Sequence, residues 1–288
     1  MQYLSNFHSH CNFCDGHASM EAFVQYAVSK GFNAYGISSH APVSFTTRWA
    51  MNYDDLPEYL QEYRRLKAKY SPEIELYVGL EIDFLPEEKD AVFQMHSSLP
   101  LDYRIGSIHY IDSFPDGTRW NVDGDPKTFK KATAEVFGGD IKKLVKCFYT
   151  QTCEMIDSCS FDIIGHMDKV AGNSAQYPEF CITDKWYIDL VKDTLALIKE
   201  KGIILEINTK ALHRKGVTFP HQQFYPLIKE MQIPVMVNSD CHRPDLILSG
   251  LEETYQALSD LGIKSVRILK QGKWTDIPIE QTPYLVSK

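Results

Sequence analysis

Seven short apolar runs occur along the chain, and each ends in a side chain that can bind a metal ion or exchange a proton. The residues at these ends are His8 with His10, His40, Glu81, His109, His166, Asn208 with Lys210, and Asp240 with His242. Asp15 and His17 follow shortly after the first run. The parallel strands of an α/β barrel present their C-terminal ends at one rim, where the active sites of such barrels lie. The series therefore predicts a barrel with a site for several metal ions at that rim.

The apolar runs alternate with helical patterns, which is the order of elements in a parallel α/β fold. The expected strands are Tyr3–Phe7, Asn33–Ser38, Ile74–Phe84, Tyr103–Ile111, Asp162–Gly165, Ile203–Ile207 and Pro234–Asn238. The expected helices are Ser19–Ser29, Leu56–Tyr70, Glu87–Ser97, Thr128–Cys159 with a break at Gly138 and Gly139, a helix through Leu190–Ile198, Phe224–Met231 and Leu251–Leu261. Ser249 and Glu252 predict a capping box for the last helix, and residues 265–278 predict a terminal strand pair. We expect one barrel domain over residues 1–288.

Composition limits the classes of function. The formal net charge of −8 argues against broad electrostatic capture of nucleic acid or of an anionic membrane. A small anionic substrate stays compatible with it, because a few local cations can outweigh a distant negative surface. No run approaches the length of about 18 apolar residues that spans a bilayer, and we expect no secretory signal. The seven cysteines are odd in number and scattered, so reduced thiols in a cytosolic protein are expected.

Two pairs of possible ligands are spaced two residues apart, His8 with His10 and Asp240 with His242. Residues i and i+2 of an extended strand point to the same side, so each pair can face one ion. A single His-x-His is weak evidence, and only its place at the end of an apolar strand favours metal binding. Glu81 also ends a buried strand, where a carboxylate is costly unless it is paired or bound to metal. Its two oxygens could bridge two cations, although a helix cap or a salt bridge at the rim is the simpler alternative.

Seven of the ten histidines lie at these strand ends or just beyond the first one, which chance clustering rarely produces. Asp83 and Asp168 are the expected carboxylates that support neighbouring histidines from outside the metal shell. Cys11 and Cys14 have the spacing of half a zinc ribbon or of a redox pair. No second Cys-x-x-Cys accompanies them, so we expect ordinary packing beside the site.

Cationic side chains follow the sixth apolar run and suit the binding of an anion. Asn208, Lys210 and Arg214 are candidate substrate contacts there, and Arg48 is another in the loop after His40. A solvated basic loop is an equally simple interpretation of any one of them. The chain has neither a Gly-rich phosphate loop nor a serine nucleophile elbow, which argues against those two chemistries.

Together these residues resemble the polymerase-and-histidinol-phosphatase (PHP) superfamily. The resemblance lies in His8-Ser9-His10, Ser38-Ser39-His40, Gly79-Leu80-Glu81, Ser107-Ile108-His109, Gly165-His166 and Ser239-Asp240-Cys241-His242. Further stretches resemble the stand-alone histidinol-phosphate phosphatases of that superfamily, namely Cys14-Asp15-Gly16-His17, Ser39-His40-Ala41-Pro42 and Glu206-Ile207-Asn208-Thr209. The resemblance covers residues 5–245, nearly the whole chain.

The resemblance implies a distorted (β/α)7 barrel of the TIM-like kind that holds two or three divalent ions, usually zinc, iron or manganese. The implied ligand sets are His8, His10, Glu81 and Asp240 for the first ion, Glu81, His109 and His166 for the second, and His40 and His242 with either Asp15 or His17 for the third. Ser39 stands where the family commonly has an aspartate, which removes a possible supporting carboxylate.

The implied activity is hydrolysis of L-histidinol phosphate in histidine biosynthesis, by a metal-activated hydroxide that attacks phosphorus in line. Asp240 would carry the proton, with His242 and His40 as alternatives, while Lys210 and Arg214 would hold phosphate oxygens. A protein tyrosine phosphatase, a small phosphodiesterase and a non-catalytic metal-binding module are the alternatives. We expect a cytoplasmic monomer or homodimer.

Overall fold

Seven parallel strands form one sheet that curls into a nearly closed barrel, as the sequence predicted. The computed structural model describes residues 3–89 and 96–283. The strands stand in the order β1 (Ser5–Asn6), β2 (Ala34–Ile37), β3 (Glu75–Asp83), β4 (Tyr103–Ser107), β7 (Ile163–Ile164), β8 (Ile204–Asn208) and β9 (Val235–Asn238). Just beyond β9 and β1, the N–H of His10 donates to the carbonyl of Cys241 at 2.9 Å, and Ser9 forms a parallel bridge with Cys241. These contacts bring the first and last strands together.

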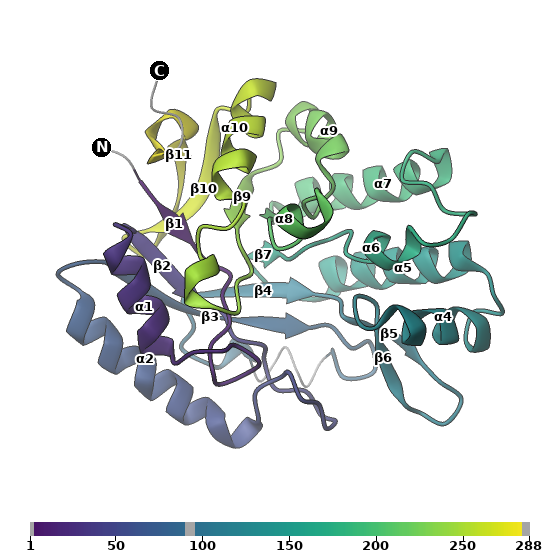
Figure 1. Ribbon diagram of the computed structural model, residues 1–288, viewed down its shortest axis with the longest axis horizontal. Coiled ribbons are helices and arrows are strands. Elements are labelled where there is room, and N and C mark those ends of the chain that lie inside the picture. The colour runs from purple at the N-terminus through teal and green to yellow at the C-terminus, as the bar shows by residue number, and fades with distance from the viewer. Residues whose placement is uncertain (1–2, 90–95, 284–288) are drawn as a thin grey trace.

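Helices surround the sheet on its outer side (Figure 1). They are α1 (Met20–Ser29), α2 (Leu56–Tyr70), α4 (Pro126–Glu135), α5 (Ile141–Ser158), α6 (Ala171–Ser174), α7 (Lys185–Lys201), α8 (Leu212–Lys215), α9 (Tyr225–Glu230) and α10 (Leu251–Leu261). Short 3-10 turns are η1 (Tyr53–Asp55), η2 (Gln222–Phe224), η3 (Pro244–Leu246) and η4 (Ile279–Gln281). In Figure 1, α1 and α2 lie together on one flank of the sheet, whereas α5 and α7 lie on the opposite flank. No helix within the described ranges is both long and apolar enough to cross a bilayer.

Local sequence signals explain where the helices begin and end. Ser19 accepts the N–H of Ala22 through its hydroxyl and so caps α1, and Asp140 caps α5 by accepting the N–H of Lys142 at 2.9 Å. Gly202 ends α7 in the left-handed conformation, with φ 69°, which glycine adopts without strain. These caps set the length of each helix and therefore the points at which the chain returns to the sheet.

The tail after α10 forms an antiparallel pair, β10 (Ser265–Lys270) with β11 (Lys273–Pro278), as expected. The pair lies close to the N-terminal end of the chain in Figure 1. At its turn, the backbone N–H of Gln271 donates to Glu75 Oε2 at 2.7 Å and that of Gly272 donates to Tyr77 Oη at 3.1 Å. The hairpin is therefore fixed to the beginning of β3.

The barrel interior is filled by an aromatic ring that lies over two glycines. The hydroxyl of Tyr103 in β4 donates to the carbonyl of Phe7 at 2.6 Å across the barrel. A Cβ at Gly79 would lie 2.5 Å from the Tyr103 ring, and a Cβ at Gly36 would lie 2.4 Å from its hydroxyl. Glycine at these two positions is thus required by the close approach of the ring.

Two expectations about local structure need correction, one on a strand and one on a helix cap. The single strand expected at Tyr103–Ile111 is β4 followed by a separate strand, β5 (Tyr110–Ser113), which turns away and pairs antiparallel with β6 (Arg119–Asn121). The break expected at Gly138 and Gly139 within Thr128–Cys159 is confirmed: both glycines adopt positive φ, and the region forms two helices, α4 and α5.

The capping box does not form, since the N-cap of α10 is Gly250, with φ 72° and no side-chain hydrogen bond. The helix expected at Glu87–Ser97 falls partly on residues 90–95, outside the described ranges.

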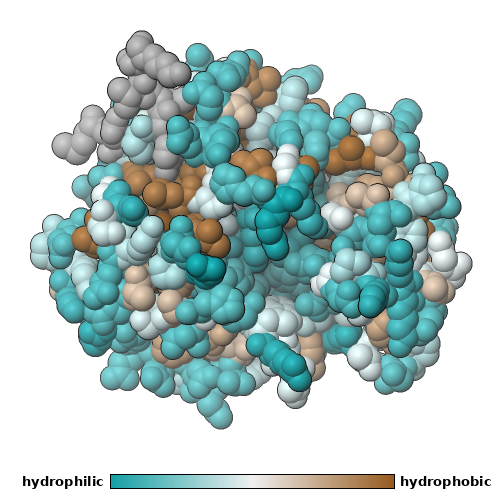
Figure 2. Space-filling view, in the orientation of Figure 1, coloured by the Kyte–Doolittle hydropathy of each residue, from teal (hydrophilic) through white to brown (hydrophobic). Residues whose placement is uncertain are grey.

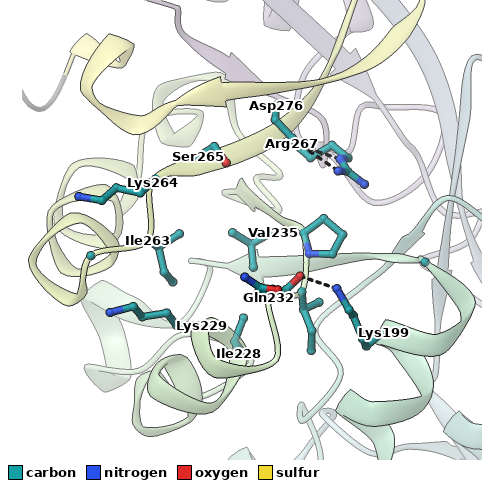
Figure 3. A pocket seen from close by; sticks show the side chains of 14 residues that line it. Lys199, Ile228, Lys229, Gln232, Val235, Ile263, Lys264, Ser265, Arg267 and Asp276 are labelled. Carbon is teal, nitrogen blue, oxygen red and sulfur yellow. Dashed lines mark hydrogen bonds and ion pairs between the residues drawn. The ribbon is translucent and has the colours of Figure 1, made fainter.

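A cavity of about 490 Å³ lies at the N-terminal end of the barrel, where β9 begins. Figure 3 shows its lining, in which Lys199 donates to the carbonyl of Gln232 and Arg267 pairs with Asp276. These two cations are thus already partnered within the protein. Because the polar residues of the strand ends lie at the other end of β9, this cavity is separate from the candidate site.

Candidate metal centre

The side chains expected at the rim meet in one cluster at the C-terminal ends of the parallel strands. The fully or almost fully buried members are His8, His10, His40, Glu81, His109, His166, Asn208 and Asp240. Asp15, Lys210 and His242 lie at its edge and are partly exposed. Figure 2, in the orientation of Figure 1, shows a hollow in the middle of the visible face that is lined mainly by hydrophilic residues. The rim of the barrel is therefore a polar site with a buried floor.

Glu81, at the end of β3, is the centre of this cluster. Its Oε2 lies 3.2 Å from His8 Nε2, 3.5 Å from His10 Nε2 and 2.9 Å from His40 Nδ1. Its Oε1 lies 2.7 Å from His166 Nε2. The carboxylate thus has imidazoles from β1 and β2 on one oxygen and from β7 on the other. This is the arrangement needed for one carboxylate to bridge two cations.

Asp240 faces Glu81 from the end of β9. Its Oδ1 lies 3.1 Å from His10 Nε2 and 3.8 Å from His8 Nε2. Lys210 Nζ donates to Oδ1 at 3.1 Å, and Asn208 Nδ2 donates to Oδ2 at 3.1 Å. Asp240 has a φ of 47°, a left-handed conformation that aspartate tolerates better than most residues and that is frequent at functional sites.

Three overlapping groups of side chains have ligand atoms close enough to hold a metal ion, all within 4.8 Å of one another. They are His8 with His10 and Glu81, then His40 with Glu81 and His109, and finally His10, Asp15, His40 and His242. Asp15 Oδ1 lies 3.2 Å from His242 Nε2 and 3.8 Å from His40 Nε2. By contrast, the side chain of His17 is exposed and belongs to none of these groups. Of the two expected alternatives, the structure brings Asp15 into the cluster.

The donor atoms fit divalent metal ions. Five buried atoms of the cluster face charged neighbours at close range but form no hydrogen bond of suitable geometry with any described residue: His8 Nε2, His10 Nε2, Asp15 Oδ1, His40 Nδ1 and Glu81 Oε2. Buried polar atoms are normally partnered, because leaving them without a partner costs free energy. Imidazole nitrogens and carboxylate oxygens are the ligands that zinc, iron and manganese accept. The clusters can therefore hold divalent metal ions.

Opposite charges stabilise the ionised form of the central carboxylates. Burial alone would raise the pKa of Glu81, but the surrounding imidazoles, His40 first among them, hold that pKa well below its usual range. Burial likewise disfavours ionised Asp240, yet Lys210 and the nearby imidazoles keep its pKa well below normal. Both side chains are thus present as carboxylates, the form that binds a cation.

The pKa values of the two imidazoles that follow β1 shift in opposite directions. Burial and the neighbouring rings of His40 and His242 lower the pKa of His10, which favours the neutral, ligating form. Burial also acts to lower the pKa of His8, but Glu206 and the two carboxylates of the cluster raise it well above normal. His8 must therefore give up a proton when it binds a cation.

Two buried carboxylates fix the orientation of the histidines. Glu206 Oε1 lies 2.6 Å from His8 Nδ1, and Asp83 Oδ1 lies 2.9 Å from His109 Nδ1. A carboxylate on the far nitrogen of a ligating histidine sets its tautomer and orientation. Asp83 was expected in this role. Glu206 was not, although its parity with Asn208 in β8 is a signal that could have indicated it.

Asp168 does not support His166 as expected. Its Oδ2 accepts the backbone N–H of His221 at 2.8 Å instead, and burial raises its pKa to about 7. The backbone N–H of His166 is bound by Glu206 Oε2 at 3.0 Å. The loop after β7 turns immediately after His166 and thus directs Asp168 toward the loop after β8.

The centre also contains a buried lysine that the sequence did not indicate. Lys169 Nζ lies 3.0 Å from His109 Nε2, 3.4 Å from His166 Nε2 and 2.9 Å from Asp123 Oδ2. A positive charge thus already lies against these two imidazoles. Burial lowers the pKa of Lys169, but Asp123 and the carboxylates of the cluster raise it overall, so the ammonium stays charged. A lone lysine in a loop gave no sequence signal for this position.

Two of the expected substrate contacts, Lys210 and Arg214, lie at the centre, whereas Arg48 does not. Lys210 contacts Asp240 directly, and Arg214 lines a small recess together with Lys169 and Lys210. Arg48 is exposed. Its neighbour Trp49 instead packs edge-on against His40, with ring centroids 4.4 Å apart. The loop after β2 therefore contributes an aromatic wall to the centre.

The cysteines near the centre occupy two environments. Cys14 lies beside the site, as expected. Its Sγ is 3.6 Å from His10 Nδ1, so the thiol also forms a hydrogen bond with a histidine of the cluster. Cys241, between Asp240 and His242, is buried on the other side, near the hydroxyl of Tyr35 at 3.9 Å.

Known proteins match this chain over most of its length. The PHP domain family matches residues 6–210. A "probable histidinol-phosphatase" of Schizosaccharomyces pombe is 26% identical over 282 residues, which covers 92% of this chain and 89% of that protein. The histidinol-phosphatase of Bacillus subtilis is 27% identical over 255 residues, covering 82% of this chain and 92% of the relative.

A solved structure has the same fold. The crystal structure of histidinol phosphate phosphatase from Lactococcus lactis, complexed with zinc, L-histidinol and phosphate, superimposes with a TM-score of 0.74 at 21% identity and covers 94% of this chain and 98% of that chain. The family match includes more than half of the chain and six of the seven strand regions that form the rim. The chain therefore belongs to the PHP domain family.

Proposed function

We propose that this protein is a metal-dependent phosphomonoesterase that hydrolyses L-histidinol phosphate to L-histidinol and phosphate. The observation that carries the proposal is the central position of Glu81, between imidazoles from three strands and opposite Asp240. The substrate follows from the relatives, which bear the name histidinol-phosphatase. We treat residues 1–288 as one barrel unit that acts in the cytoplasm, as a monomer or homodimer.

Zinc, iron or manganese ions would be held by overlapping ligand sets. These are His8, His10, Glu81 and Asp240 for one ion, Glu81, His109 and His166 for a second, and Asp15, His40 and His242 for a third. When bound, such ions make a water molecule acidic enough to attack phosphorus and neutralise charge on the phosphoryl oxygens. Glu206 and Asp83 orient the histidines for this task.

The cations of the chain itself would hold the phosphate oxygens that do not react. Lys169 and Lys210 lie on two sides of the cluster, one against His109 and the other against Asp240, and Arg214 lines the recess between them. Positive charges fixed in a partly buried site stabilise the charge of a phosphoryl group more strongly than the same groups do in water. Lys169 thus joins Lys210 and Arg214 as a candidate phosphate contact.

Asp240 is the candidate for moving the proton to the leaving oxygen. Its Oδ1 faces His10 and accepts from Lys210, while Asn208 donates to Oδ2, so both oxygens of the carboxylate are held in place. His242 and His40 lie at the open edge and are alternatives for the same task.

The test is phosphate release from L-histidinol phosphate beside a phosphotyrosine peptide and a cyclic nucleotide, with metal content measured on the same preparation. We expect turnover of histidinol phosphate, and a loss of roughly a hundredfold or more in Glu81→Gln and Asp240→Asn. Glu73→Gln, just before β3, and Asp193→Asn, on α7, are both exposed and outside the cluster, and they serve as matched controls. Full metal occupancy with turnover of only the peptide or the cyclic nucleotide would overturn the assignment of L-histidinol phosphate as the substrate. Unchanged activity in both site variants would overturn the proposal that Glu81 and Asp240 belong to a catalytic metal centre.

A further inference from the structure

The ring of His10, just beyond β1, is restrained by two other imidazoles. Its centroid lies 4.2 Å from that of His40 and 4.2 Å from that of His242, and the His242 ring is inclined to it by 27°. Such contacts restrain the plane of the ring. They do not select one edge, because the torsion that orients an imidazole has two broad minima related by a half-turn. A contact at the ring edge must therefore decide which nitrogen points toward Glu81 and Asp240.

Cys14 supplies such a contact from the turn that follows the first strand. Its Sγ lies 3.6 Å from His10 Nδ1, within hydrogen-bond distance for sulfur. The carbonyl of Cys11 fixes the turn by accepting the backbone N–H of Cys14 at 3.0 Å and that of Gly16 at 3.1 Å. The turn also packs directly on the main chain, since a Cβ at Gly16 would lie 2.1 Å from the His10 carbonyl oxygen. The backbone therefore holds the sulfur against one edge of the ring.

The thiol proton of Cys14 has an acceptor of its own. The S–H group donates to the carbonyl of Cys11 at 3.5 Å, so the sulfur can accept the Nδ1–H of His10. An imidazole that carries its proton on Nδ1 has a free lone pair on Nε2, which is the form that binds a metal ion. In His10, Nε2 is the nitrogen that lies 3.1 Å from Asp240 Oδ1 and 3.5 Å from Glu81 Oε2. The contact with sulfur thus favours the tautomer whose free nitrogen faces these carboxylates.

Other histidines of the centre have a charged group at the corresponding nitrogen. These pairs are His8 with Glu206 and His109 with Asp83. At His10 the neutral thiol of Cys14 takes that place. Because sulfur is a weak acceptor, its loss should reduce metal affinity less than the loss of either carboxylate.

We propose that Cys14 is a positioning residue of the metal centre: its sulfur accepts the Nδ1–H of His10 and thereby keeps Nε2 turned toward the carboxylates in the ligating tautomer. Cys14 acts in this role through His10 and not by contact with the substrate. The inference rests on the proposed function, since His10 is one of the metal ligands proposed there.

The first test measures zinc affinity by competition with a coloured chelator. Cys14→Ala removes the acceptor but keeps the backbone hydrogen bonds of the turn, and we expect it to weaken zinc binding roughly tenfold. Cys14→Asn restores a neutral acceptor, because a carboxamide oxygen reaches farther from Cβ than sulfur does and forms shorter hydrogen bonds. We expect its affinity to stay within about threefold of the unmodified protein. Cys147→Ala, at a partly exposed cysteine of α5, is the matched control and should leave the affinity unchanged.

The second test observes the tautomer directly. Nuclear magnetic resonance spectra of zinc-loaded protein with 15N-labelled histidine rings show which ring nitrogen carries a proton and whether that proton exchanges with water. We expect a protected Nδ1–H at His10 in the unmodified protein and in Cys14→Asn. In Cys14→Ala this signal should disappear through exchange, while those of His8 and His109, which are bonded to carboxylates, persist. A general disturbance of the turn would not affect one ring alone.

The outcomes separate this inference from the proposed function. Equal zinc affinities in Cys14→Ala and the unmodified protein would overturn the inference, and so would an affinity in Cys14→Asn as low as that in Cys14→Ala. If Cys14→Ala folds poorly, the unmodified protein still decides the question, because a proton on Nε2 of His10 would contradict the proposed tautomer. Neither measurement uses a substrate. Failure to hydrolyse L-histidinol phosphate would therefore overturn the proposed function without altering these results.

Discussion

At the scale of single residues, the centre depends on ionisable groups that would be costly to bury separately. Glu81 and Asp240 lie in the barrel almost without solvent exposure, and imidazoles surround them. A buried carboxylate is tolerated only when charges or hydrogen bonds compensate for its lost hydration. Part of that compensation comes from residues that would not touch a metal ion. Glu206 is such a residue, since it binds His8, Asn208 and the backbone of His166.

We therefore expect Glu206→Gln to weaken zinc binding by roughly tenfold to a hundredfold, because the far nitrogen of His8 loses its anionic partner. The affinity is measured by competition with a coloured chelator, and circular dichroism reports the fold. Glu200→Gln, an exposed change on α7, is the matched control. Affinity within about twofold of the unmodified protein would show that His8 is held by other contacts.

The choice between Asp15 and His17 can be tested in the same way. We expect Asp15→Asn to weaken the binding of the ion held by His40 and His242 by roughly tenfold or more, because Asp15 lies among these imidazoles. His17→Gln should leave every affinity unchanged, since that side chain is exposed. Metal titration followed by elemental analysis gives both values. The reverse result would mean that the loop after β1 rearranges when metal binds.

At the scale of elements, the strands are short but their placement is precise. β1 and β7 have two residues each, yet they deliver His8 and His166 to the same carboxylate. Close packing inside the barrel fixes their positions, and the Tyr103 ring over Gly36 and Gly79 is the clearest example. An interior packed this closely tolerates neither added volume nor shifted strands.

Gly79→Ala should therefore destabilise the fold by about 1–3 kcal/mol, because the added methyl group would overlap the Tyr103 ring. Denaturant unfolding measures the change. Tyr103→Leu in the same chain should reduce the penalty, since it removes the ring. Gly172→Ala is the control, because its nearest neighbours would be 3.6 Å away or more. Additive effects of Gly79→Ala and Tyr103→Leu would contradict direct contact.

At the scale of the whole molecule, the centre connects the first strand with the last. His8 and His10 follow β1, and Asp240 follows β9, so one cluster contains residues more than two hundred positions apart in the chain. Ions bound there would hold together the two edges at which the barrel closes. A ligand that binds only the folded state stabilises it in proportion to the logarithm of its concentration over its dissociation constant.

Removal of metal by a chelator should lower the thermal midpoint of unfolding by roughly 7 °C, which corresponds to about 4 kcal/mol in a domain of this size. Differential scanning calorimetry measures the shift, and addition of zinc should reverse it. Asp240→Asn, which weakens the proposed centre, should show a smaller difference between loaded and chelated protein. An unchanged midpoint after complete metal removal would mean that the barrel closes without help from the ions.

The sequence by itself determined the order of strands and helices and the identity of most residues at the rim. Apolar runs that end in histidine or carboxylate indicate where each strand lies and at which of its ends the ligand side chains stand. Because parallel strands share one rim, these side chains are expected to meet there. His8, His10, His40, Glu81, His109, His166 and Asp240 could all be named from this local signal.

Only the tertiary structure decided how the loops complete the centre. It placed the side chain of Asp15, rather than that of His17, against the His242 ring, brought Lys169 against His109, and turned Asp168 away from His166. These contacts depend on the path of loops and on strands that are distant in sequence. Strand periodicity stops at the end of a strand, so it carries no information about where the following turn directs a side chain.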